Sequence, residues 1–347
     1  MSNMTPLAAA LLLVASGSIM ANEHVAEVEQ SGTDNIAEQT QSGVMQRSYI
    51  RQDGSRNNAL TDQSGTSGEA SQALIDQTGT LNSAVIYQVH ASQPGRADAQ
   101  IYQTGDANNA RVEQQASLGD LAATATVHQE GAGNQLDARQ TWVGNQLDVI
   151  SIGQDNIVQV DQSGFSTAAI HQTGSTNRVQ LEQVSSGIGG GFAVVEQHGS
   201  ANQADIYQVS GRYPAGDVWL EQSGTANIAQ IRASDGYSTL DYTQRGTGNE
   251  LNASFAGQNS SIDGYSEGSY NQVDIAQVGD DNSLDIAQLG SHNRIEASQG
   301  FNAHTAYIGQ TGDSNQALLR QDTLSLGGHN ASIVQTGSGN FASVVQQ

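Results

Sequence analysis

Side-chain amides recur at fixed spacing along the chain. The segment from Ala73 to Gln88 reads ALIDQTGTLNSAVIYQ, and within it Gln77, Asn82 and Gln88 are separated by five and six residues. An amide side chain carries hydrogen-bond donors and an acceptor, so identical amides stacked above one another can bond along a column. The chemistry that this spacing predicts is hydrogen bonding between repeated units rather than catalysis.

The same unit recurs fourteen times, with a period of roughly 22 to 26 residues. Counted from a leading glutamine, each unit has glycine two positions on, asparagine five on, a small or branched apolar residue seven on and usually a trailing glutamine eleven on. The leading glutamines that we assign to a structural ladder are Gln30, Gln77, Gln103, Gln129, Gln172, Gln197, Gln222, Gln288, Gln310 and Gln335. The ladder asparagines are Asn35, Asn82, Asn108, Asn134, Asn177, Asn202, Asn227, Asn293, Asn315 and Asn340. The turn glycines are Gly32, Gly79, Gly105, Gly131, Gly174, Gly199, Gly224, Gly290, Gly312 and Gly337.

Alternating apolar residues flank the glycine and asparagine of each unit. This alternation predicts β-strands, because successive side chains of a strand point to opposite faces of a sheet. Glycine accepts a positive φ without steric cost and asparagine tolerates it better than most residues, so both are expected in the turn between the strands. The predicted fold class is all-β: residues 22–347 form a single parallel β-solenoid of about fourteen strand-turn-strand rungs. Its two facing parallel sheets would have a cross-β, amyloid-like arrangement.

The amides are expected inside the solenoid. Counting the alternation from Ile75 and Ile86 places Gln77, Asn82 and Gln88 on the same face as the apolar residues. A lone buried amide is costly, whereas a stacked one can bond to its neighbours above and below. The alternative is that the amides face solvent and only shape the turns.

Four residues break the two glutamine columns, and they fall in the sixth, ninth, tenth and eleventh units. They are Ser151, Ala233, Phe255 and Ser266. The middle of the chain is therefore expected to be its least regular region.

Composition excludes several classes of function. The chain has no cysteine, which rules out disulfides, thiolate metal sites and cysteine catalysis. Its formal net charge of −23 argues against binding to nucleic acid and against insertion into or adsorption on an anionic membrane, since those partners call for a basic surface. An apolar run from Leu7 to Val14, followed by small residues, predicts a signal peptide over residues 1–21 and hence export.

Acidic and histidine side chains are the remaining candidates for chemistry. The acids are spread over every unit, whereas the paired carboxylates of a polysaccharide-active β-helix enzyme would converge at one place. The eight histidines lack the close pairing of a zinc site, and most are expected on outward, solvated positions. The sequence therefore predicts no catalytic residue, no metal and no cofactor, and the β-helix enzyme remains only an alternative.

The Gln-x-Gly-x-x-Asn-x-Ala-x-x-x-Gln pattern resembles the curlin repeat of bacterial curli fibre subunits. The closest stretches are ALIDQTGTLNSAVIYQ, AQIYQTGDANNARVEQQ and ASIVQTGSGNFASVVQQ, and the resemblance covers residues 23–347. The repeat looks more like that of the minor, nucleating subunit than that of the major one.

The resemblance implies a structural subunit of functional amyloid. Such a subunit is exported through the periplasm and an outer-membrane secretion pore with accessory factors, and it assembles with itself and with a second curlin-type subunit. The implied location is an extracellular fibre on a bacterial cell surface, where it serves adhesion and the biofilm matrix. A solenoid adhesin that does not polymerise is the alternative within the same fold.

Overall fold

The computed structural model describes residues 24–65, 71–90, 96–116, 121–186, 189–322 and 328–347. Every regular element in these residues is a β-strand. The expected signal peptide, residues 1–21, lies outside the described part of the chain.

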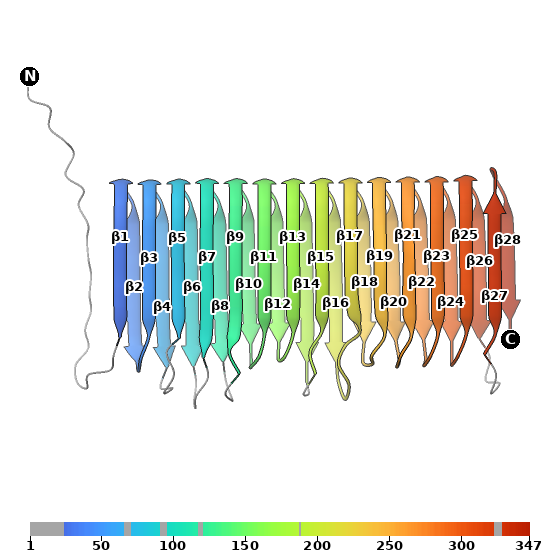
Figure 1. Cartoon of the computed structure of the whole chain (residues 1–347), viewed down its shortest axis with the longest axis horizontal. Helices are drawn as coiled ribbons and strands as arrows, with labels where there is room; N and C mark the ends of the chain where they lie inside the picture. The colour runs from blue at the N-terminus through green and yellow to red at the C-terminus, as the bar shows by residue number, and fades with distance from the viewer. Residues whose placement is uncertain (1–23, 66–70, 91–95, 117–120, 187–188, 323–327) are drawn as a thin grey trace, which may run out of the picture. The chain divides into compact units, whose positions relative to one another are not determined.

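The strands belong alternately to two parallel sheets (Figure 1). The odd-numbered strands form the first sheet in sequence order: β1 Val25–Thr33, β3 Arg47–Ser55, β5 Gln72–Thr80, β7 Ala97–Asp106, β9 Ala123–Ala132, β11 Gln146–Gln154, β13 Thr167–Ser175, β15 Phe192–Ser200, β17 Asp217–Thr225, β19 Thr239–Thr247, β21 Ser261–Ser269, β23 Ser283–Ser291, β25 Thr305–Asp313 and β27 Asn330–Thr336.

The even-numbered strands form the second sheet in the same way: β2 Ile36–Gly43, β4 Asn58–Gly65, β6 Ser83–His90, β8 Asn109–Ala116, β10 Gln135–Thr141, β12 Ile157–Ser163, β14 Arg178–Ser185, β16 Gln203–Ser210, β18 Ile228–Ser234, β20 Glu250–Ala256, β22 Gln272–Val278, β24 Arg294–Gly300, β26 Gln316–Asp322 and β28 Phe341–Gln346. With fourteen described strands in each sheet, the predicted all-β solenoid of strand-turn-strand rungs is confirmed.

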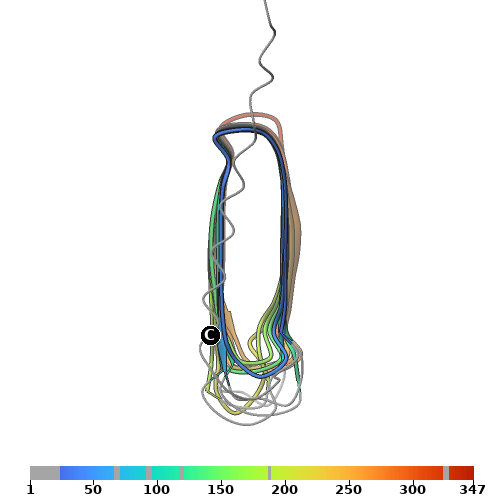
Figure 2. The same cartoon turned by 90° about the vertical axis from the view of Figure 1, so that its left-hand side faces the viewer.

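The chain forms two compact units that meet in sequence between Val158 and Gln159. In the first unit, β5 pairs with β7 so that Gln77 lies opposite Gln103. In the second, β15 pairs with β17 in the same register. Seen along the stacking direction, the coils of each unit superimpose as flattened loops whose two long sides are the two sheets (Figure 2).

The interior of each coil is built from the alternating apolar residues. Ile75, Ile86 and Ile101 are fully buried, and their neighbours in sequence point outward. Each such isoleucine contributes about 1.5 to 3 kcal/mol through burial. Because a single coil leaves its upper and lower edges open, that burial is completed only by the coils on either side.

The turn from an odd to an even strand departs from the expectation for asparagine. Positive φ occurs at Gly79 (119°) and at Leu81 (59°), but not at Asn82. The asparagine keeps an ordinary backbone and uses its side chain instead. Glycine is required at its own position for two reasons, the positive φ and the close approach of the next coil: a Cβ on Gly79 would lie 2.1 Å from the carbonyl oxygen of Gly105.

The other corner of each coil, from an even strand to the next odd one, varies in length. We call it the return corner. The return from β2 to β3 needs only three residues, whereas that from β16 to β17 takes six. The extra residues of the longer return loop out at this corner and leave the strand register unchanged.

Candidate functional site: three ladders of buried amides

The leading glutamines form a hydrogen-bonded ladder inside the first sheet. Gln77 Nε2 donates to Gln103 Oε1 at 2.8 Å and to the carbonyl of Asn58 at 3.1 Å. Gln77 Oε1 accepts a hydrogen bond from Gln52 Nε2 at 2.8 Å. Both polar ends of this fully buried side chain are therefore satisfied, which removes the cost of burying it.

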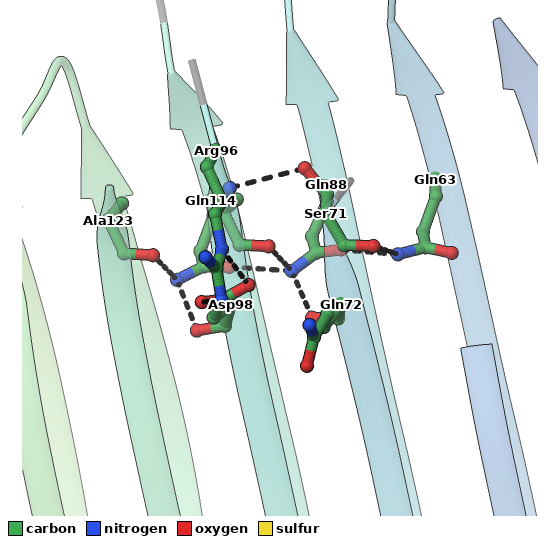
Figure 3. A network of polar contacts seen from close by, with 9 residues as sticks. Gln63, Ser71, Gln72, Gln88, Arg96, Asp98, Gln114 and Ala123 are labelled. Carbon is green, nitrogen blue, oxygen red and sulfur yellow. Dashed lines mark hydrogen bonds and ion pairs between the residues drawn. The ribbon is translucent and has the colours of Figure 1, made fainter. Parts of the chain in front are cut away.

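The trailing glutamines form a second ladder, at the return corner of the second sheet (Figure 3). Gln63 Nε2 donates to Gln88 Oε1 at 2.7 Å, and Gln88 Nε2 donates to Gln114 Oε1 at 2.9 Å. Gln88 Nε2 also lies 2.9 Å from the carbonyl oxygens of Gln72 and Ala97. The assignment of ladder residues from sequence omitted these glutamines, although the same spacing signal identifies them. The hydrogen-bonded members are Gln41, Gln63, Gln88, Gln114 and Gln140 in the first unit, and Gln162, Gln183, Gln208, Gln277, Gln299, Gln321 and Gln346 in the second.

The asparagines form a third ladder at the tight turn, and it runs the opposite way. The backbone N–H and Nδ2 of Asn108 both donate to Asn82 Oδ1, at 3.0 and 3.2 Å. Asn108 Nδ2 also donates to the carbonyl of Gly131 at 3.0 Å. The glutamine columns thus donate toward the C-terminal coil, and the asparagine column donates its side-chain-to-side-chain bonds toward the N-terminal coil.

The structure places the predicted ladder residues in these columns. The glutamines from Gln77 to Gln335 and the asparagines from Asn82 to Asn315 in the predicted set are buried, whereas Gln30, Asn35 and Asn340, on the first and last coils, are partly or largely exposed. All ten predicted turn glycines have a positive φ. The alternative in which the amides face solvent does not describe the interior coils.

The middle of the chain was expected to be least regular, and for the backbone this is wrong. β18, β20 and β22 pair in unbroken register through Ala233 and Phe255. The irregularity is confined to side chains: the Phe255 ring is buried in the glutamine column, and the small Ala233 lies beside it. Among the described residues, Gln277 Oε1 consequently has no hydrogen-bond partner, because the coil before it offers no amide.

The serine at the eleventh leading position, Ser266, is compensated in a different way. Tyr242 is fully buried, and its hydroxyl lies 2.7 Å from Ser266 Oγ, which donates to Gln288 Oε1 at 2.9 Å. A Cβ on Gly264 would lie 2.7 Å from the Tyr242 ring, so the glycine leaves the space that the ring fills. Burial raises the pKa of Tyr242, and its hydroxyl stays protonated at neutral pH.

We expect the substitutions at Ala233 and Phe255 to be coupled. Ala233→Gln alone should cost about 2 to 3 kcal/mol, because its buried amide would face a phenyl ring, and Phe255→Gln alone should cost a similar amount. The double variant should cost less than the sum by at least about 1 kcal/mol, since it restores the column from Gln208 to Gln277. A double-mutant cycle on the free energy of unfolding measures this coupling, and strictly additive energies would contradict it.

Outside the ladders, acidic side chains gather on the outer face of the first sheet. Asp241, Asp263 and Asp285 are stacked on the outer face of the first sheet and line a hollow of about 510 Å³ together with Tyr265 and Tyr307. Burial, and then the charges of the neighbouring aspartates, raise the pKa of Asp263. The described residues contain no group of three or more histidine, aspartate or glutamate side chains arranged to hold a metal ion.

His304 is an exception to the expectation that most histidines are outward and solvated. It is fully buried, and its ring stacks on that of His329. The return corner varies in length, so counting alternation along the chain does not locate these residues. In the described part of the chain, no helix has the length and apolar character needed to cross a membrane.

These features define the protein as a parallel β-solenoid repeat protein whose distinctive site is a set of internal amide ladders. A scan against protein-family models finds no match to the chain, and neither does a search of curated proteins.

Proposed function

We propose that the protein is a secreted structural subunit of curli-type amyloid fibres, which grow when the first coil of one copy stacks on the last coil of another. The observation that carries this proposal is the direction of the three ladders. Because each ladder has a fixed direction, the two ends of the array present different hydrogen-bonding groups.

At the C-terminal end the glutamine columns present donors. Gln335 Nε2 and Gln346 Nε2 each make one hydrogen bond, to the carbonyls of Gln316 and Asn330, and each retains a second hydrogen. The asparagine column presents an acceptor there, because Asn340 Oδ1 accepts nothing from the described residues.

At the N-terminal end the arrangement is the reverse. Gln30 and Gln41 donate to the second coil, and their Oε1 atoms accept no hydrogen bond from the described residues. The backbone N–H of Asn35, which in later coils donates to the preceding asparagine, has no acceptor among the described residues. A second copy in head-to-tail register would match every donor with an acceptor, whereas head-to-head contact would oppose acceptor to acceptor.

The unpaired strand edges also favour a second copy of the chain as the partner. β1 and β2 at one end, and β27 and β28 at the other, each have one edge that no described strand pairs. Unpaired edges of this length are templates for another chain, and stacking in register continues both sheets at once. The abundant outward acids would keep free copies apart through charge repulsion.

The resemblance to curlin repeats adds a location, an export route and a biological role to the proposal. It implies a fibre outside a bacterial cell, formed from a chain exported through the periplasm and an outer-membrane pore. The implied partner is a second curlin-type subunit, and the implied roles are in adhesion and biofilm matrix. In this proposal the chain acts by templated stacking and has no catalytic role.

Cysteine cross-linking tests the head-to-tail joint, and the cysteine-free chain gives it a clean background. Continuing the register places Ser332 of one copy beside Glu27 of the next, since Tyr307 pairs with Ser332 and Glu27 pairs with Tyr49. Paired strands lie about 4.8 Å apart, within the range for a disulfide. Mild oxidation of fibres of the Ser332→Cys/Glu27→Cys variant should therefore give a ladder of covalent oligomers.

The matched control is Ser332→Cys/Glu29→Cys, which offsets the pair by two residues and separates the Cα atoms by about 8 Å, too far to bridge. Dilute monomer of the first variant should stay uncross-linked. Purified mature chain that remains monomeric when seeded would refute the fibre proposal and favour the non-polymerising adhesin. Fibres that cross-link equally in both variants would refute the head-to-tail register.

A further inference from the structure

Histidine occupies the same position of the return corner in the first coil of the first unit and in the last two coils of the second unit. His24 precedes β1, His304 precedes β25 and His329 precedes β27, and each lies one residue before the paired positions of its strand. In the second unit the equivalent residue one coil below His304 is Asn282. The backbone N–H of His304 donates to Asn282 Oδ1 at 2.9 Å, so a side-chain acceptor at this position bonds the N–H of the coil that follows.

The two C-terminal histidines keep this pattern and add ring stacking. The backbone N–H of His329 donates to His304 Nδ1 at 3.1 Å, and the ring centroids are 5.4 Å apart with an interplanar angle of 12°. An Nδ1 that accepts must carry no proton, so His304 is the neutral tautomer with its hydrogen on Nε2. That Nε2 is buried and finds no partner of ordinary hydrogen-bond geometry among the described residues.

The N-terminal histidine is held in the same tautomer. His24 Nδ1 accepts the backbone N–H of Gln46 at 3.1 Å, and Nε2 lies 3.1 Å from the carbonyl of Gly43, to which it donates. Both ends of the array therefore use a neutral imidazole to bond the neighbouring coil. His329 Nδ1 has no donor among the described residues, because β27 has no described strand on its outer edge.

We propose that the joint between two copies contains a stack of three imidazoles, His304 and His329 of one copy and His24 of the next, which must be neutral for the joint to close. In this stack the backbone N–H of His24 in the incoming copy donates to His329 Nδ1. The proposal rests on the proposed head-to-tail function and adds its regulation: mildly acidic solution opens the joint.

Protonation acts on this joint in two ways. It places a hydrogen on Nδ1, which turns the acceptor into a donor facing another donor, and it places like charges on rings stacked about 5 Å apart. Burial lowers the pKa of His304, opposed in part by the Gly300 backbone and by Asp322. The stability from neutral His304 is thus complete above its ordinary pKa of 6.5 and is lost as pH falls through the lowered value.

The carboxylates around the stack do not offset this loss. Asp322, at the end of β26, forms an ion pair with Arg320 at 2.8 Å. Asp280, in the turn of the coil below His304, accepts a hydrogen bond from the Gln258 N–H, and Asp281 bonds the side chain of Asn259. On the side of the incoming copy, the described partners of His24, Gln46 and Gly43, are uncharged.

Seeded elongation at different pH values tests the proposal. Acid should otherwise speed assembly, because the chain has 35 acidic against 12 basic residues and a pI near 4.3, so its self-repulsion falls on acidification. We expect wild-type elongation instead to slow about tenfold between about pH 7.5 and about pH 5. His24→Asn/His329→Asn should remove this slowing, since asparagine already serves as the neutral acceptor at position 282.

The matched control is His198→Asn, an exposed histidine on β15, which should slow as the wild type does. Histidine ¹⁵N spectra of wild-type fibres at neutral pH should show Nε2-protonated neutral rings for His24, His304 and His329, and in the double variant the signals of His24 and His329 should be lost while that of His304 remains. If wild-type fibres elongate faster in acid, as the double variant is expected to do, the imidazole stack is refuted but the proposed head-to-tail fibre is not. The absence of fibres from every variant at every pH would overturn the proposed function and the joint with it.

Discussion

Replacement of Gly199 by alanine is expected to destabilise the second unit by about 3 to 5 kcal/mol. Gly199 has φ 112°, outside the left-handed region that alanine tolerates, and an added Cβ would lie 2.1 Å from the carbonyl oxygen of Gly224. That oxygen accepts a hydrogen bond from Asn202 Nδ2, so displacing it would also disturb the asparagine ladder. The midpoint of denaturant unfolding and hydrogen exchange in β15 and β17 would measure the loss.

A glycine in the same kind of turn provides the control. Gly339 has φ 69°, and a Cβ there would meet no atom within 4 Å. Alanine already adopts this conformation at Ala107, Ala201 and Ala226. Gly339→Ala should therefore cost no more than about 1 kcal/mol. Equal losses at Gly199 and Gly339 would show that neither the φ of 112° at Gly199 nor the approach of the next coil explains the glycine column.

Gly337→Ala is expected to block elongation at the C-terminal end about a hundredfold or more. A Cβ on Gly337 would have only Asn340 Nδ2 near it, at 3.7 Å, so within one copy the change meets no neighbouring coil and carries only the strain of its φ of 104°. In the proposed joint, however, Gly337 faces Gly32 of the next copy as Gly312 faces Gly337, where an added Cβ would lie 2.1 Å from the carbonyl oxygen. The methyl group would therefore occupy the place of the incoming chain.

The measurement is seeded growth with the variant added in small amounts to wild-type monomer. The variant should join growing C-terminal ends through its normal first coil and then stop them. Gly339→Ala, in the same last turn, should elongate almost as the wild type does. Normal growth of Gly337→Ala would contradict a joint in which the glycine columns are continuous between copies.

The repeat made most of the fold predictable. Alternation around Ile75 and Ile86 determines which side chains point inward, and fourteen repetitions of one spacing determine that equivalent residues stack. The buried positions of Gln77 and Asn82 follow from these two facts alone. The ladders could be predicted because identical amides at identical heights have few other ways to satisfy their hydrogen bonds.

Other features depend on information that the repeat does not carry. The direction of each ladder is set by the rotamer of the amide, which spacing does not specify. The positive φ at Leu81 belongs to a residue of no preferred type, so composition gives no signal for it. The fit of Tyr242 to Gly264 and Ser266 joins neighbouring coils and becomes visible only when the columns, rather than the consecutive units, are compared.

The opposed directions of the ladders also have an electrical consequence. In an α-helix the peptide dipoles add head to tail, and the ends acquire partial charges. In a regular coil of this protein, two glutamine amides and one asparagine amide point along the stacking axis in opposite senses, so their dipoles partly cancel. The dipole moment along the stacking axis therefore grows less with each added coil than it would if all three columns pointed the same way. The terminal coils consequently acquire little partial charge with which to attract ions from solution.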